Sequence, residues 1–184
     1  MEMTLVNNIY DYVGKPSEGL IRVKIGKIAQ FKCGFIDLAE KVIVPLIYTN
    51  VRDFKEGKAA VRIGNWAMGK CGFINHKGEL IIPCIFDKVY SFSDGIAKVI
   101  YNKKWYFIDT NGTFVIALDS FVSCSDFKNG IATIKQKIEG NIHTVTIDKT
   151  GNVVTDLSKY QVSKNSLSHS YWTSEMLEEL YHLK

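Results

Sequence analysis

The sequence predicts an all-β protein, built as an array of about four three-stranded β-hairpin or meander repeats. A phrase of about 38 residues recurs through the 184-residue chain, and such periods are typical of repeat arrays. Within each copy, apolar residues alternate with polar ones. Alternation with a period of two is typical of a strand that buries one face, so each copy is expected to be made of strands.

Each copy has two anchor positions. The first is a glycine, spaced by 38, 38 and 35 residues, at Gly19, Gly57, Gly95 and Gly130. The second is an Asp or Asn, at Asp37, Asn75, Asp109 and Asp148. Three residues after the second anchor comes a glycine, except in the first copy, which has Glu40. Asp or Asn opening a turn and Gly closing it predict a type I hairpin turn, which we expect to be looser at Glu40.

Three strands are predicted in each copy. In the first copy they are Ile21–Ile25 after the glycine anchor, Gly34–Ile36 before the Asp anchor, and Val42–Val44 after the turn. Pro45 follows the third strand, and Pro83 takes the same position in the second copy. Because proline has no N–H to donate, we expect it to end that strand.

The repeats divide the chain into three parts. Residues 1–13 are predicted to be a truncated N-terminal repeat or cap, because Ile9–Val13 matches Ile85–Val89. Residues 14–162 hold the four repeats, and residues 163–184 a polar linker and a short C-terminal amphipathic helix. The N-terminal piece duplicates the phase of the C-terminal end, which favours an open, solenoid-like array over a propeller-like ring. The helix is expected either to cap the last repeat or to dock into a partner's groove.

Composition narrows the class of protein. With 46% hydrophobic and 23% charged residues, the chain is expected to fold as a soluble protein. The net charge of +4 is too small to predict nucleic-acid binding. We see neither a signal peptide nor a run of 18 apolar residues, so a cytoplasmic protein with no membrane contact is expected.

No set of residues predicts catalysis, a metal site or a cofactor. The cysteines lack the close ligand pairs of metal sites, and Cys33 and Cys71 share one repeat position that suggests small buried side chains. The Asp/Asn anchors are explained by their turns. We therefore expect a protein that is not an enzyme.

The third copy resembles a known family. Its phrase Lys104-Trp105-Tyr106-Phe107-Ile108-Asp109, with Phe92-Ser93-Asp94-Gly95 before it and Gly112 after it, resembles the WG-repeat (KWG) family of bacterial β-rich repeat proteins. The family phrase is roughly Lys-Trp-Gly-Tyr/Phe-Ile-Asp-x-x-Gly. Cys33 and Cys71 replace the tryptophan in the first two copies, and the fourth copy is the most divergent. The resemblance covers residues 5 to about 162 and implies a bacterial, non-catalytic binding or scaffold protein.

Basic side chains on the first strands form one set of candidate binding residues. These are Arg22, Lys24, Arg62, Lys98 and Lys135. Stacked repeats would align them as a basic stripe that fits an acidic protein surface, the alternative being an ordinary solvated face. No aromatic residues interleave with them, so nucleic acid is not the expected partner.

Apolar residues at hairpin tips form the second set. Phe31, Trp66 and Met68 lie between the first and second strands, where loops are normally polar. Exposed apolar clusters mark interaction sites. The alternative is that Phe31 and Trp66 fold back onto a neighbouring repeat and replace the bulk lost at Cys33 and Cys71.

The function expected from these observations is a non-enzymatic binding or scaffold module that engages a protein partner through the repeat surface. The alternative is a carbohydrate or cell-surface binding module, because Trp and Tyr side chains can form platforms for sugar rings.

Overall fold

The structure is a computed structural model that describes residues 9–27, 30–65, 67–118 and 121–155, which form four antiparallel β-sheets. The first sheet contains β1 (Tyr12–Ser17), β2 (Leu20–Ile25), β3 (Lys32–Asp37) and β4 (Val42–Tyr48). The second contains β5 (Asn50–Val51), β6 (Ala59–Ile63), β7 (Lys70–Ile74) and β8 (Leu80–Phe86). The third contains β9 (Lys88–Val89), β10 (Ala97–Tyr101), β11 (Lys104–Ile108) and β12 (Phe114–Leu118). The fourth contains β13 (Phe121–Cys124), β14 (Ile131–Ile138) and β15 (Asn141–Asp148).

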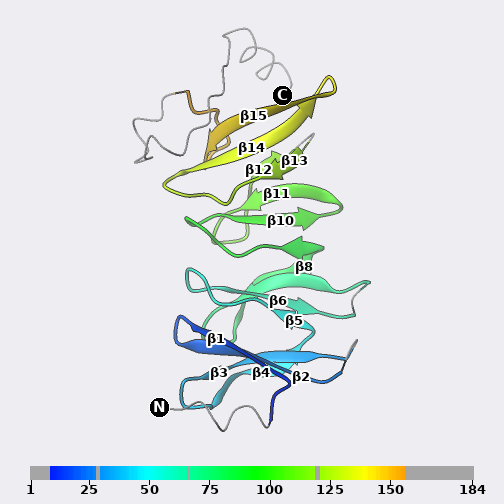
Figure 1. The fold of residues 1–184 in the computed structure, drawn as a ribbon, viewed down its shortest axis with the longest axis vertical. Coiled ribbons are helices and arrows are strands. Elements are labelled where there is room, and N and C mark those ends of the chain that lie inside the picture. The colour runs from blue at the N-terminus through cyan, green and yellow to red at the C-terminus, as the bar shows by residue number, and fades with distance from the viewer. Residues whose placement is uncertain (1–8, 28–29, 66, 119–120, 156–184) are drawn as a thin grey trace.

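The sheets follow one another along the long axis, from the first sheet at one end to the fourth at the other (Figure 1). The all-β prediction and the open array are therefore confirmed. In the described ranges no helix is long and apolar enough to span a membrane. The predicted C-terminal helix lies outside the described residues.

In the described residues the fourth sheet lacks the predicted third strand, where only an isolated bridge joins Ile147 to Val153, and every sheet has one strand that the sequence did not predict. This strand precedes the glycine anchor and pairs antiparallel with the strand after it, joining Val13 to Val23, Val51 to Val61 and Val89 to Val99. The segment around Val13 therefore supplies the first strand of the first repeat. In the second and third sheets this strand escapes periodicity analysis because β5 and β9 are only two residues long.

The prediction that proline ends the third strand is wrong. Pro45 lies inside β4, between Val44, which pairs with Phe35, and Tyr48, which pairs with Cys33. Two steps along β3 thus correspond to four along β4, so the proline sits in a bulge. Since bulged residues leave the hydrogen-bonded ladder, a bulge tolerates a residue without an N–H. Pro83 has the same place in β8.

The bulge explains the glycine that precedes Phe35 and Phe73. A Cβ atom on Gly34 would lie 2.4 Å from Val44 O, and one on Gly72 would lie 2.4 Å from Ile82 O. The third repeat has no such bulge, and there Tyr106 pairs directly with Ala117. Glycine in one strand and proline in the next are therefore two parts of one local geometry.

The turn chemistry is confirmed. In the first repeat Asp37 Oδ1 accepts hydrogen bonds of 2.9 Å from the N–H groups of Ala39 and Lys41. The expectation of a looser turn at Glu40 is wrong. Glu40 N donates to Asp37 O at 3.1 Å, and Glu40 adopts a left-handed φ of 65°, like Gly78 at 82°.

Glu40→Gly is expected to raise the free energy of unfolding by about 1 kcal/mol. Left-handed geometry costs an L-residue roughly 1–2 kcal/mol, which glycine does not lose, but the larger conformational entropy of glycine in the unfolded chain offsets part of this gain. Chemical denaturation measures the change. The matched Gly78→Ala substitution should destabilise the protein, and a stabilising effect there would contradict the argument.

The core is a series of layers between the sheets. The predicted inward residues Val61 and Val99 are buried, as are Cys33 and Cys71. Each layer contains a Phe–Phe pair in which the turn phenylalanine of one repeat meets a strand phenylalanine of the repeat before. The three pairs have ring centroids 4.8–4.9 Å apart and are Phe35–Phe54, Phe73–Phe92 and Phe107–Phe127.

Hydrogen bonds between equivalent turns fix the spacing of the repeats. Glu18 Oε2 accepts a bond of 3.0 Å from Gly57 N, Glu56 accepts from the N–H groups of Asp94 and Gly95, and Asp94 accepts from Gly130 N. Because each acid binds the turn of the next repeat, neighbouring sheets are held in one relative position.

Candidate binding grooves

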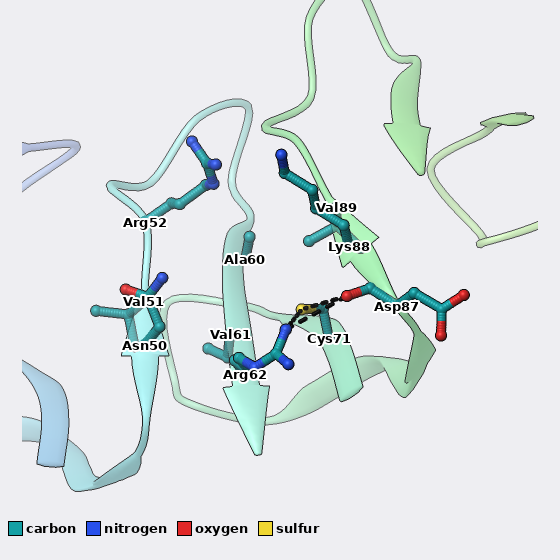
Figure 2. Close-up of a pocket in the computed structure, with 10 residues that line it drawn as sticks. All are labelled: Asn50, Val51, Arg52, Ala60, Val61, Arg62, Cys71, Asp87, Lys88 and Val89. Carbon is teal, nitrogen blue, oxygen red and sulfur yellow. Dashed lines mark hydrogen bonds between the residues drawn. The ribbon is translucent and has the colours of Figure 1, made fainter. Parts of the chain in front are cut away.

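In the described part of the chain, grooves open between neighbouring sheets, and two of them are lined by basic residues. The central groove lies between the second and third sheets, has a volume of about 370 Å³, and is shown in Figure 2. Its lining residues are Asn50, Val51, Arg52, Ala60, Val61, Arg62, Cys71, Asp87, Lys88 and Val89. The proximal groove lies between the first and second sheets, with a volume of about 290 Å³. Its lining residues are Tyr12, Arg22, Val23, Lys24, Cys33, Asn50 and Val51.

The grooves have equivalent floors. Cys33 pairs with Lys24 across β3 and β2, and Cys71 pairs with Arg62 across β7 and β6. In the third sheet the same register position belongs to Trp105, which pairs with Ile100. A small side chain thus stands in each groove where the third repeat has an indole.

Basic side chains surround the central groove. Arg62 Nη1 lies over the floor, where it donates to Asp87 O at 3.3 Å and contacts Cys71 Sγ at 3.6 Å. Figure 2 shows Arg52 and Lys88 on opposite sides of the groove, each on a different sheet. The groove therefore presents three cationic groups from two repeats.

Asp87 is the acidic residue of this lining, and its carboxylate is already bound. Lys70 Nζ donates to Oδ1 and Lys103 N donates to Oδ2 at 3.1 Å. The hydrogen bond from Lys70, followed by that from Lys103, holds the pKa of Asp87 below its usual value. The carboxylate stays charged, and Figure 2 shows it turned away from Arg62.

Tyr90 gathers three cations beside the central groove. Arg52 Cζ lies 5.5 Å from the centroid of its ring, Lys88 Nζ 5.0 Å and Lys98 Nζ 4.7 Å. Cations over an aromatic ring are attracted by its quadrupole, which offsets part of their mutual repulsion. Lys98 Nζ also donates to Cys124 O at 3.3 Å. A positive patch thus continues from the groove onto the third repeat.

The proximal groove is satisfied internally. Arg22 Nε lies 2.9 Å from Asp53 Oδ1, and Arg22 Nη2 donates to the Tyr12 hydroxyl at 2.9 Å. Lys24 Nζ lies 3.1 Å from the centroid of the Phe31 ring. Arg22 is thus paired with a carboxylate, whereas Arg52 and Lys88 contact the Tyr90 ring, so the central groove is the stronger candidate site for an anionic partner.

The comparison with known families agrees with this repeat geometry. The family model described as "WG containing repeat" matches residues 9–27, 34–65, 72–105 and 107–137. The chain belongs to the WG-repeat family. No curated protein matches it.

The cations of the predicted basic stripe lie in two rows, at two register positions of the strand that follows the glycine anchor. Lys24, Arg62 and Lys135 occupy one register position, which Ile100 takes in the third repeat, and Arg22 and Lys98 occupy the other. Four of the five predicted cations line a groove or lie beside one. Lys135 is exposed on β14, in the fourth sheet.

The hairpin tips separate the apolar candidates. Phe31 is half-buried against the core between the first two repeats, as the fold-back alternative expects. Met68 is 81% exposed, and Trp66 lies outside the described residues. In the fourth repeat β14 and β15 are joined by a two-residue turn, Glu139-Gly140, because Ile138 still belongs to β14.

Sequence analysis missed Arg52, Lys88 and Tyr90 as groove residues. Lys88 lies in the short strand β9, and Arg52 and Tyr90 directly follow β5 and β9, which carry no periodic pattern. A signal does exist in the repeat spacing, because Arg52 and Tyr90 each follow a valine that precedes a glycine anchor. Within the described ranges, His, Cys, Asp and Glu side chains form no group of three that could hold a metal ion.

Proposed function

We propose that this WG-repeat protein is a non-enzymatic binding module that engages an acidic surface of a protein partner along the groove side of its array. The central groove carries the proposal, because Arg52, Arg62 and Lys88 converge there around about 370 Å³ of open volume. Complementary charge gives specificity and fast association between proteins.

The architecture supports a macromolecular partner. Stacked repeats present an extended, rigid surface, and such arrays typically bind other chains along it. Pockets within an interface are where a few residues supply most of the binding energy. The carbohydrate alternative needs an exposed aromatic platform, whereas Trp105 is only half-exposed and its ring lies 5.9 Å from that of Tyr90.

The test is capture of the partner by tagged protein from cells that express it, followed by affinity measurement. Arg52→Glu combined with Lys88→Glu is expected to weaken binding about tenfold or more and to flatten its dependence on salt, because two favourable charges become repulsive. Both side chains are exposed, so the fold should persist.

Lys41→Glu combined with Lys77→Glu is the matched control. It makes the same change in net charge at exposed positions of the Asp/Asn turns, which line neither groove. Equal loss of binding in both variants would show that net charge, and not the central groove, governs association.

A further inference from the structure

We propose that the central groove receives an aromatic side chain from an acidic segment of the partner, seated over Cys71 where the third repeat places Trp105. The inference rests on the proposed function and specifies what the groove recognises.

Strand register carries the first step. Cys71 pairs with Phe86, and Trp105 pairs with Leu118, at equivalent places in the second and third sheets. The indole of Trp105 lies 5.9 Å from the Tyr90 ring centroid and 5.9 Å from Lys98 Nζ. The third repeat thus shows which neighbours a ring at this position contacts.

The second repeat has equivalent positions around Cys71, but other residue types occupy them. Arg52 N donates to Ala60 O at 2.9 Å, as Tyr90 N donates to Lys98 O at 2.9 Å, so Arg52 takes the place of Tyr90 and Ala60 that of Lys98. A ring over Cys71 would therefore lie beside Arg52 and above Ala60, and it would stack on the Arg62 guanidinium, which contacts Cys71 Sγ at 3.6 Å. Guanidinium groups stack favourably on aromatic faces.

The groove has the size and floor that such a ring needs. Its floor is apolar, because Ala60, Val61, Cys71 and Val89 all line it and are buried. Its volume of about 370 Å³ lies at the lower end of the range of roughly 300–1,000 Å³ for ligand pockets. One aromatic side chain fits this description better than an extended apolar segment.

The rim specifies the residues around the ring. Arg52 and Lys88 both line the groove, with Arg52 Cζ 5.5 Å and Lys88 Nζ 5.0 Å from the centroid of the Tyr90 ring. Carboxylates on either side of the inserted ring would neutralise them, and arginine can bind a carboxylate with two hydrogen bonds. The groove therefore fits an aromatic residue flanked by Asp or Glu.

The proximal groove lacks these features and serves as an internal control. In the first repeat Gly14 holds the position that Arg52 has in the second, because each follows the valine of the equivalent strand pair. A Cβ on Gly14 would lie 2.7 Å from Arg22 Cγ, so the Arg22 side chain takes up the space beside this glycine. Arg22 itself is paired with Asp53. The two grooves share Asn50 and Val51 but no cation, so filling the proximal groove should leave the cations of the central groove in place.

Fluorescence anisotropy with labelled peptides at low ionic strength tests the inference. The probes are acetyl-EDWDE-amide and acetyl-EDADE-amide, which differ only in the central ring. We expect the tryptophan peptide to bind the full chain about tenfold or more tightly than the alanine peptide, because aromatic anchors in pockets dominate interface energetics.

Two variants locate the site. Cys71→Trp fills the central groove and should lower affinity for the tryptophan peptide about tenfold or more, whereas Cys33→Trp fills the proximal groove and should leave it unchanged. Melting curves check that both variants fold. Arg52→Gln, which adds no bulk, should weaken binding of the same peptide even if Cys71→Trp is unstable.

The outcomes separate this inference from the proposed function. If the two peptides bind equally well and Arg52→Glu with Lys88→Glu weakens both, ring insertion is overturned. The proposal of an acidic partner is then still supported. Equal loss in Cys71→Trp and Cys33→Trp would overturn the assignment to the central groove. Absence of peptide binding would also overturn the inference, while capture of the partner still tests the proposed function.

Discussion

Phe92→Ala is expected to lower the free energy of unfolding by about 3–5 kcal/mol, the usual cost of deleting a buried phenylalanine. Phe92 is 1% exposed, and its ring centroid lies 4.8 Å from that of Phe73. It begins the turn of the third repeat but packs on the second, in the core layer that also contains Ala97 and Val99. Truncation therefore opens a cavity at the joint between two repeats.

Chemical denaturation followed by two probes measures this effect. In a stacked array each repeat contacts only its neighbours, so a weakened joint can also separate the unfolding of the two halves. Met68→Ala is the control, since Met68 is 81% exposed and should cost less than about 0.5 kcal/mol. Similar costs for the two substitutions would show that the Phe–Phe contacts do not hold the repeats together.

Local chemistry made much of the fold predictable. Alternation around Val61 and Val99 identifies the buried face, because a strand turns successive side chains to opposite sides. The Asp37 turn is equally local, since its side chain binds backbone groups two and four residues later. These features need no knowledge of the rest of the chain.

The grooves depend on non-local packing and could not be predicted in the same way. Arg52 and Lys88 face one space only because the second and third sheets stack. Whether Phe31 would fill the volume lost at Cys33 depended on the path of a hairpin tip. In the structure Phe31 lies under Lys24 and packs at the edge of the core, and a groove remains above each cysteine.

The bulge shows how a correct local rule led to a wrong expectation. Proline does lack the N–H that a ladder needs, but β4 accommodates Pro45 by leaving the ladder for three residues and rejoining it at Tyr48. The paired glycine, Gly34, was present in the sequence as part of the same signal. Reading the two together, against Tyr106 and Ala117 in the third repeat, would have predicted the bulge.

Gly72→Ala is accordingly expected to destabilise the protein by about 3 kcal/mol, at the upper end of the usual cost of overpacking. The added Cβ would lie 2.4 Å from Ile82 O and 2.8 Å from both Pro83 C and Cys84 N. All three are backbone atoms, so no side-chain rotation can relieve the clash. Relief requires β8 to move away from β7 and lose the bulge.

A double-mutant cycle with Pro83→Ala tests this cause. Pro83→Ala keeps the two extra residues of the bulge but frees the φ angle that the proline ring fixes, so β8 should move away from β7 at lower cost and accept a larger residue at position 72. The double variant is expected to be more stable than the sum of the single changes by about 1 kcal/mol or more, as coupled neighbours allow. Gly72→Ala with Pro45→Ala is the matched control, because Pro45 belongs to the bulge of the first sheet and should act additively. Additivity in both cycles would mean that the clash at Gly72 does not arise from the proline bulge.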